Sequence, residues 1–453
     1  MRNFSTNPNP QRSLEVWGGL ECTVNRVGDS FFDQAAWSGA DTRSGDLGRI
    51  ADLGIRTLRM GFNWETIERT GSWDLFDTQL EECRRLGITP IAGLLHHGSG
   101  PTYTSLLDTC FVEKFTRYAE TFARRYPWVT LYTPINEPHT TARFAALYGH
   151  WYPHRRSLKD FVRALINQIH GTVSAMGVIR TVNPEAKLVT TEDAGRTFST
   201  PELDSVREHR EHRKWLGTDL LCGRVSRHHP LFRWLLECGL SEAEVLWFSE
   251  NPCPPSILGL NYYVTSDRFL DHRLDRYESY FTGGDGYEPL VDIEAVRVRE
   301  EGIAGTRSIL LEAWQRYGIP LVITEAHLGC DADEQMRWLN RVWSDAKEAR
   351  TAGADVRAVT VWALFGSWNW CHLVTRDTGA YEAGVFDLSA EINEDGAARP
   401  LETELAGLVR ELARLGHSNH PALHSRGWWE KSDRLLHPLN ESEVENAESR
   451  VSR

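Results

Sequence analysis

The sequence lacks any long hydrophobic run, since no apolar stretch approaches the roughly 18 residues that a membrane-spanning helix needs. Its first segment, MRNFSTNPNPQRS, is polar and has no apolar stretch that could act as a secretory signal. A basic surplus is also lacking, because 63 acidic residues outnumber 50 basic ones and the formal net charge is -13. Nucleic-acid binding requires a basic stripe. We therefore expect neither a membrane nor a nucleic acid among the partners of this chain.

Cysteine motifs are missing as well. The eight cysteines are scattered along the chain, and no two of them form a CxxC pair. An HExxH motif and a Cys-rich ligand set, which would indicate zinc, are also absent from the sequence. We expect reduced and mostly buried thiols in a cytoplasmic protein, with no metal site and no cofactor.

What the sequence does contain is an alternation of short apolar runs with longer amphipathic segments. Strands are expected at residues 14–20, 57–62, 89–95, 130–135, 187–191, 256–263, 320–324 and 358–364. Segments such as FDTQLEECRRLG and RSILLEAWQRYG lie between them, with helical periodicity and a terminal glycine. Strands that alternate with helices form parallel sheets with right-handed crossovers. Eight such units favour a (β/α)8 TIM barrel over a Rossmann sheet, because no GxGxxG follows a strand.

The fold class predicted is therefore α/β, with one TIM barrel over residues 1–416 that carries loop insertions. Residues 222–255 are expected to form helices inserted at the rim. The segment DHRLDRYESYFTGGDGYEP, residues 271–289, reads as a mobile loop where a substrate lid is common. Residues 417–453 form a C-terminal extension, expected to be an arm that packs through Trp428 and Trp429 and then a disordered tail.

Acidic residues follow several of the expected strands: Glu21 the first, Glu137 the fourth, Glu192 with Asp193 the fifth, and Glu325 the seventh. Barrel chemistry occurs at the C-terminal strand ends, where a buried carboxylate is costly unless it is paired or used. Each residue alone fits a structural salt bridge equally well. Strands four and seven, however, lie nearly opposite each other. Glu137 and Glu325 can then sit about 5 Å apart, as in a retaining glycosidase, where one protonates the leaving oxygen and the other forms a covalent glycosyl-enzyme.

The motifs around these two residues resemble glycoside hydrolase family 1, the β-glucosidase and β-galactosidase family. TPINEPHTTA is similar to that family's Thr-Leu-Asn-Glu-Pro motif, and LVITEAHLG to its Ile-Thr-Glu-Asn-Gly motif. The resemblance runs from Val16 to about Leu388. It implies that Glu137 is the acid/base and Glu325 the nucleophile. Within the family, the chain resembles a divergent branch, the barrel domain found fused to dTDP-4-dehydrorhamnose reductase-like domains.

The same resemblance assigns three supporting residues. TLRMGFNW is similar to the family's Tyr-Arg-Phe-Ser strand and puts Arg59 beside the nucleophile, while LGLNYYVTS implies that Tyr263 hydrogen-bonds it. Asn136 is expected to hold the sugar 2-hydroxyl. A cation and a phenol donor stabilise negative charge on Glu325. Glu137 must instead hold a proton near neutral pH, through burial and through repulsion by Glu325.

The substrate contacts implied by the resemblance are partly altered. LLHHGSGP places His96 on a sugar hydroxyl, and VWALFGSWNW makes Trp362 and Trp370 the aromatic platform. The family's glutamate that binds the 4- and 6-hydroxyls is here Asn369, and its N-terminal glutamine is Asn25. An unmade hydrogen bond to a charged acceptor costs about 1–3 kcal/mol. We therefore expect poor activity on plain β-glucosides and a preference for a sugar changed at position 4 or 6, such as a deoxy sugar.

The leading hypothesis is a retaining exo-β-glycosidase of small glycosides or oligosaccharides, with shifted sugar specificity. A transglycosylase using the same two glutamates is an alternative, because nothing in the residues separates water from another acceptor. A non-catalytic sugar-binding barrel is a further alternative, supported by the altered contacts. It has no physical need to keep an acid and a nucleophile together. The sequence predicts no oligomeric state.

Overall fold

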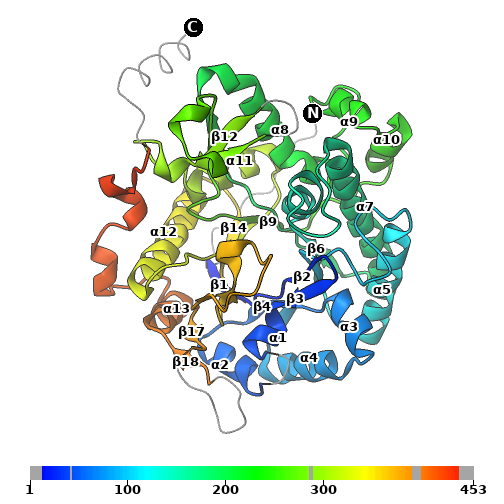
Figure 1. Cartoon of the computed structure of the whole chain (residues 1–453). Helices are drawn as coiled ribbons and strands as arrows, with labels where there is room; N and C mark the ends of the chain where they lie inside the picture. Colours follow the sequence, from blue (N-terminus) through cyan, green and yellow to red (C-terminus); the bar gives the residue numbers. More distant parts are fainter. Residues whose placement is uncertain (1–12, 41–42, 285–288, 390–398, 438–453) are drawn as a thin grey trace.

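An eight-stranded parallel sheet forms the centre of the computed structural model, which describes residues 13–40, 43–284, 289–389 and 399–437 (Figure 1). The strand order is β7-β6-β5-β4-β1-β14-β13-β9. Its strands are β1 (Glu15–Gly19), β4 (Thr57–Gly61), β5 (Thr89–His96), β6 (Leu131–Asn136), β7 (Lys187–Leu188), β9 (Leu258–Asn261), β13 (Leu321–Ala326) and β14 (Val356–Val361). All eight predicted strands are therefore confirmed, although β7 and β9 are shorter than expected.

The two edge strands of this sheet meet and close the barrel. Isolated parallel bridges join Val189 to Ile257 and Asp193 to Asn261. The backbone N–H of Asn261 also donates to the carbonyl of Glu192 at 2.9 Å. The chain beyond β7 thus pairs through single bridges instead of a regular ladder, which explains the short β7. The closed ring is the predicted TIM barrel.

Helices surround the barrel, as Figure 1 shows. The outer helices are α2 (Asp46–Asp52), α3 (Trp64–Thr70), α4 (Asp74–Leu86), α5 (Phe111–Arg125), α7 (Leu158–Val182), α8 (Asp204–Leu221), α11 (Thr306–Tyr317), α12 (Ala332–Thr351) and α13 (Glu404–Leu415). Sequence signals set their ends. Gly87 ends α4 in the left-handed region at φ 66°, and the Asp331 side chain accepts the Glu334 N–H at the start of α12.

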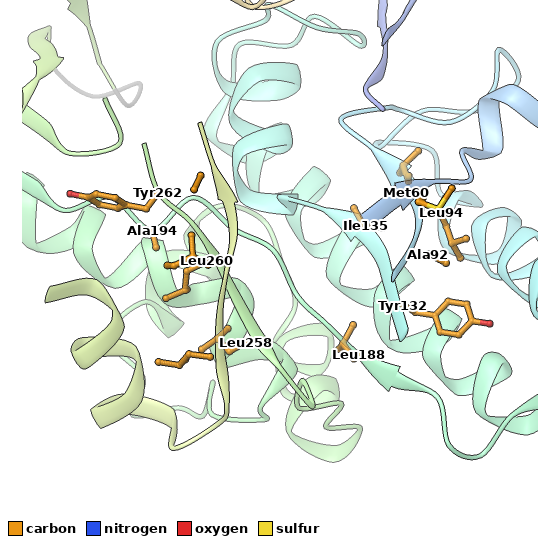
Figure 2. Close-up of a cluster of buried hydrophobic side chains, with 14 of the residues drawn as sticks. Met60, Ala92, Leu94, Tyr132, Ile135, Leu188, Ala194, Leu258, Leu260 and Tyr262 are labelled. Carbon is orange, nitrogen blue, oxygen red and sulfur yellow. The ribbon is translucent and has the colours of Figure 1, made fainter. Parts of the chain in front are cut away.

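Side chains of the sheet point alternately inward and outward. Ile91 belongs to the cluster inside the barrel, which comprises Trp17, Ile91, Val189, Ile257, Val322 and Ala358. Its neighbours Ala92 and Leu94 belong to the larger cluster between strands and helices, part of which Figure 2 shows. This is the period of two of a β-strand. The inner cluster fills the barrel below the C-terminal strand ends and leaves those ends available for polar residues.

Insertions extend the barrel on the side of its fifth and sixth strands. Helices α9 (Phe232–Glu237) and α10 (Glu242–Glu250) confirm the helices expected in residues 222–255. A second sheet with order β11-β12-β10-β8 consists of β8 (Thr197–Ser199), β10 (Arg268–Asp271), β11 (Thr282–Gly283) and β12 (Leu290–Glu294). The segment 271–289, expected to be a loop, therefore contributes strand β11 to this sheet. Residues 285–288 lie outside the described residues.

Short elements complete the loops. They are β2 (Val24–Val27), β3 (Ser30–Asp33), α1 (Gln34–Ser38), α6 (Pro138–Ala142), η1 (Arg143–Leu147), η2 (Pro201–Leu203), η3 (Leu274–Arg276), η4 (Ser279–Phe281), η5 (Ala295–Arg297), β15 (Ser367–Trp368), η6 (Trp370–His372), β16 (Tyr381–Glu382), β17 (Phe386–Asp387) and β18 (Leu401–Glu402). No helix in the described part of the chain is both long and apolar enough to cross a membrane.

All eight cysteines are free, but only Cys22, Cys83, Cys238 and Cys253 are buried. The expectation of mostly buried thiols was therefore wrong for the other four.

The C-terminal arm packs beside α12, where Figure 1 shows it in red. It comprises η7 (Pro421–His424), η8 (Trp428–Glu430) and η9 (Ser432–Arg434). Trp429 is buried and meets Trp338 edge to face, with ring centroids 5.1 Å apart. The Trp428 backbone N–H donates to Glu334 at 3.0 Å. Residues 438–453, where a disordered tail was expected, lie outside the described residues.

Candidate active site

Strand β6 ends in Asn136, and the next residue, Glu137, turns the chain sharply into helix α6. Glu137 has φ 40° and ψ 62°, a left-handed conformation that non-glycine residues adopt at a cost. Pro138 follows at the first helical position, where its missing N–H leaves no bond unmade. The sequence Asn136-Glu137-Pro138 therefore ends a buried strand and turns a carboxylate into the barrel mouth.

The Glu137 carboxyl is buried among other acids. Burial raises its pKa well above the usual range, and the negative charges of Glu325, Glu192 and Asp193 raise it further. The Asn261 amide opposes this shift by donating to Glu137 Oε1 at 2.6 Å. These conditions suit a group that holds a proton near neutral pH.

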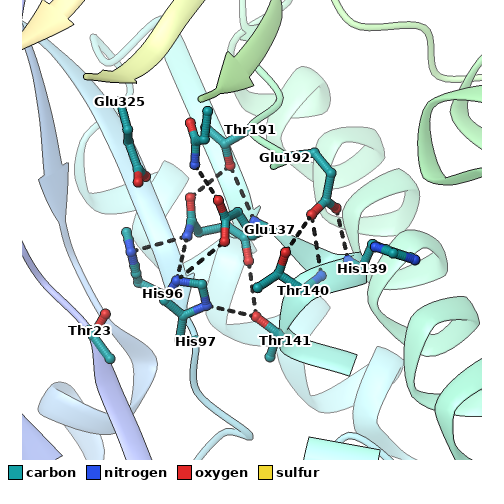
Figure 3. A network of polar contacts seen from close by, with 12 residues as sticks. Thr23, His96, His97, Glu137, His139, Thr140, Thr141, Thr191, Glu192 and Glu325 are labelled. Atoms are coloured by element: carbon teal, nitrogen blue, oxygen red, sulfur yellow. Dashed lines mark hydrogen bonds and ion pairs between the residues drawn. The ribbon is translucent and has the colours of Figure 1, made fainter. Parts of the chain in front are cut away.

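Glu192 lies beneath the start of α6. Its carboxylate accepts the backbone N–H groups of His139 at 2.8 Å and Thr140 at 3.3 Å, and also the Thr140 hydroxyl (Figure 3). Burial raises the pKa of Glu192 to about 7, while these hydrogen bonds lower it. The residue thus holds the turn that carries Glu137 and places a titratable charge near it.

Glu325, in β13, has a different environment. Arg59 Nη1 lies 2.9 Å from its Oε1, and the Tyr263 hydroxyl donates to its Oε2. The second Arg59 nitrogen donates to Asn136 Oδ1 at 2.8 Å. The guanidinium lies 4.8 Å from the ring centroid of Trp362. The structure therefore brings the five predicted catalytic residues together, and Figure 3 shows Glu137 and Glu325 facing a common space.

Two neutral histidines complete this layer. His96 Nε2 accepts from the Asn136 amide at 3.1 Å, and its ring stacks on Trp362 at 5.7 Å. Burial lowers the pKa of His96 well below its usual value and that of His97 to about 3. His97 Nε2 lies 3.7 Å from a Glu137 oxygen. Since a neutral imidazole carries no charge, this contact does not oppose the rise in the pKa of Glu137 that burial and the acidic neighbours cause.

Glu137, Glu325 and Tyr263 line a cavity of about 1130 Å³, whereas Arg59 and Asn136 are not among its lining residues. The wall near the two glutamates includes Glu21, His96, His97, Glu137, Tyr263, Glu325, Trp362 and Trp370. Arg143 and Lys214 line a more distant part, and the C-terminal arm contributes Trp428, Asp433 and Arg434. Within the described residues, no group of three or more His, Cys, Asp or Glu is placed to hold a metal ion.

Asn25 and Asn369, which are expected to contact the sugar, lie outside the cavity lining. The Asn369 side chain is 1% exposed and binds inward: its amide donates to Asp377 at 3.1 Å and its oxygen accepts the Thr378 N–H at 2.9 Å. Asn25 is 0% exposed and donates to the Val374 carbonyl at 2.9 Å. Neither residue lines the cavity. In this structure both amides bind the loop of residues 369–380, so their contact with substrate stays a prediction.

Three residues of the site were not predicted. Asn261 belongs to the segment LGLNYYVTS, in which the family resemblance assigns a role to Tyr263 alone. His97 follows His96 and faces the same cavity. Glu21 was recognised only as an acid after the first strand, and that position was the available signal for a cavity residue.

Comparisons with known proteins show the family of this chain. The model of Glycosyl hydrolase family 1 matches residues 25–381. Beta-glucosidase 47 of Arabidopsis thaliana is 23% identical over 415 residues, covering 82% of this chain and 76% of that protein. The 6-phospho-beta-glucosidase of Clostridium longisporum is 22% identical, covering 78% and 80%.

A solved structure gives the same fold. The beta-glucosidase from Thermotoga maritima, in complex with a methoxycarbonyl-substituted glucoimidazole, has a TM-score of 0.67 at 16% identity, covering 90% of this chain and 98% of that one. Since the family model spans most of the sequence, the chain belongs to glycosyl hydrolase family 1 and is a retaining glycoside hydrolase.

Proposed function

We propose that the protein is an exo-acting β-glycosidase of small glycosides or oligosaccharides, with Glu137 as acid/base and Glu325 as nucleophile. One observation carries the proposal: the two buried carboxyls facing one cavity have opposite surroundings. Glu325 accepts hydrogen bonds from a guanidinium and a phenol, whereas Glu137 has acidic neighbours that raise its pKa. Such a difference divides the roles of nucleophile and acid between two carboxyl groups.

The reaction follows from these surroundings. Glu325 attacks the anomeric carbon while the bond to the leaving oxygen breaks, and Glu137 gives that oxygen its proton. Glu137, now ionised, takes a proton from water as the water attacks the same carbon. The ester bond then breaks and Glu325 is regenerated. Asn136 is fixed by Arg59 and His96, which supports its role in holding the sugar 2-hydroxyl.

The sugar is proposed to differ from plain glucose. The inward-facing amide of Asn369 supports this, because the residue at that position is neutral and is turned away from the sugar. The free state of all eight cysteines supports a reducing compartment such as the cytoplasm.

A panel of aryl β-glucoside, β-galactoside, β-fucoside and β-xyloside tests the proposal, with the anomer of the first product read by proton NMR. We expect hydrolysis with retention and a preference for a sugar other than glucose. A strong preference for glucose contradicts the shifted specificity. Absence of turnover on a broad panel favours a binding barrel instead.

A further inference from the structure

Glu21 is a carboxylate of the cavity wall that has no part in the mechanism above. Glu21 lies two residues beyond β1, is 8% exposed and lines the same cavity as Glu137 and Glu325. A carboxylate buried beside a reaction centre is costly unless it is paired or used.

Each oxygen of the Glu21 carboxylate accepts one hydrogen bond from the protein. Its Oε1 accepts the Thr23 backbone N–H at 2.9 Å, and its Oε2 accepts the Trp370 indole N–H at 2.9 Å. In the described part of the chain, no Lys, Arg or His forms an ion pair with it. A carboxylate has about four acceptor positions, so two protein donors leave room for donors from a ligand.

The position of Glu21 is on the side of the nucleophile. Its ring partner Trp370 lines the cavity wall, and the backbone of β1 is close to Trp362, since a Cβ on Gly19 would lie 2.3 Å from that indole. Burial raises the pKa of Glu21, and the charge of Glu325 adds to the shift. Glu21 therefore faces the part of the cavity in which the sugar bound to Glu325 would lie.

We propose that Glu21 binds hydroxyl groups of the sugar that is attacked by Glu325, and that it determines which sugars are accepted. This inference rests on the proposed function. Glu21 supplies the acceptor that Asn25 and Asn369, with their amides turned inward, do not supply. A buried carboxylate without a counter-ion accepts O–H donors and repels anions. The sugar should therefore be uncharged, and phosphorylated sugars or uronic acids should bind poorly.

Binding of compounds that the enzyme does not cleave tests this inference without relying on turnover. The probes are the phenyl 1-thio-β-glycoside of the sugar that the aryl-glycoside panel shows to be preferred, its monodeoxy analogues, and phenyl 1-thio-β-glucoside 6-phosphate, with dissociation constants from calorimetry. For Glu21→Gln we expect about tenfold weaker binding of the parent compound, as for loss of a hydrogen bond to a charged acceptor. One deoxy analogue should bind the variant and the unmodified protein equally, because it lacks the hydroxyl that Glu21 holds. The 6-phosphate should bind the unmodified protein less tightly than the parent compound.

Three further variants separate binding from structure. Glu21→Asp keeps the negative charge, but its shorter side chain moves the carboxylate away from the sugar. This variant should therefore bind the same hydroxyl less tightly. Trp370→Phe removes the indole donor. Glu312→Gln is the matched control, because Glu312 also accepts an indole N–H, from Trp215 at 2.7 Å, but is not among the residues that line the cavity, and it should change affinity by about twofold at most.

Several results would overturn the inference. One is an equal loss of affinity for all probes in Glu21→Gln, and another is the hydroxyl-specific loss of affinity in Trp370→Phe as well. Tight binding of the 6-phosphate, or no binding of any probe by the unmodified protein, would also contradict it. Equal losses would mean that Glu21 only positions the indole. A protein that shows the hydroxyl-specific effect but cleaves no aryl glycoside would contradict the proposed function alone.

Discussion

Asn261 pairs in register with Glu325 across strands β9 and β13, and its side chain donates to Glu137 at 2.6 Å. The Thr324 hydroxyl donates to the Asn261 oxygen at 2.7 Å, which fixes the amide so that its nitrogen points to Glu137. One asparagine thus connects the strand of Glu325, the proposed nucleophile, with Glu137, the proposed acid/base. The relative position of the two glutamates is set by backbone pairing as well as by side-chain packing.

Replacing Glu137 by Gln should remove the proton donor but keep the cavity shape. We expect the rate to fall about 10²- to 10⁴-fold for substrates with poor leaving groups. The loss of kcat/KM should be small for dinitrophenyl glycosides, whose leaving group needs no proton, whereas kcat should still fall because the second step has lost its base. Steady-state kinetics across a leaving-group series measures the difference. A uniform loss across the series would show that Glu137 is not the acid.

Replacing Glu192 by Gln should move the alkaline limb of the kcat/KM profile to lower pH. The pKa of Glu192 is about 7, so its charge is present where Glu137 loses its proton, and it raises the pKa of Glu137. Removing the charge makes that proton easier to lose. Asp193→Asn should shift the limb in the same direction, and Glu382→Gln should leave it in place. An unmoved limb in Glu192→Gln would contradict the assigned electrostatics.

Glu65 should make stability depend on pH. Burial raises its pKa from 4.5 to about 8, although its carboxylate accepts the Gly100 N–H at 2.9 Å. The folded state then binds a proton that the unfolded state releases, so this contribution is present below pH 4.5 and is lost as pH rises to about 8.

The variant Glu65→Gln should lack this loss. Its free energy of unfolding, measured by urea at pH 5 and pH 9, should fall less with pH than that of the unmodified protein. The gap should be a few kcal/mol. Parallel pH dependence in the two proteins would show that Glu65 does not carry the raised pKa.

The C-terminal arm should contribute to the stability of the barrel. Trp429 is 4% exposed against Trp338, so Trp429→Ala should cost about 3–5 kcal/mol through lost burial and a cavity. Leu436→Ala is the control on the same arm, because Leu436 is 61% exposed. Urea unfolding compares the two. Equal and small effects would mean that the arm packs on the barrel without stabilising it.

Much of the barrel could be predicted from sequence because each strand is a short apolar run, and these runs alternate along the chain with amphipathic helical segments. The strand-end residues could be predicted for the same reason, since Glu137 and Glu325 come within one residue of regular strands or inside them. The position of Asn369 could not. Its φ of 59° turns the amide toward residues 377–380, a loop conformation that a matching residue spacing does not reveal.

Glu21 shows the opposite case. The acid was visible after the first strand, but its place in the cavity depends on how the chain leaves β1 and on the indole of Trp370, 349 residues away in sequence. Long-range contacts of this kind are decided by tertiary packing. They are therefore the part of the site that local patterns predict least.

The central claim is that Glu325 forms a covalent bond to the sugar. Incubation with 2-deoxy-2-fluoro β-glycosides bearing a dinitrophenyl leaving group, read by intact mass and then by peptide mapping, tests it most directly. We predict one stable fluoroglycosyl adduct per chain, located on Glu325 in the peptide that contains LVITEAHLG. An adduct on Glu137 or another residue, or hydrolysis of the parent glycosides with inversion and no adduct, would contradict the account.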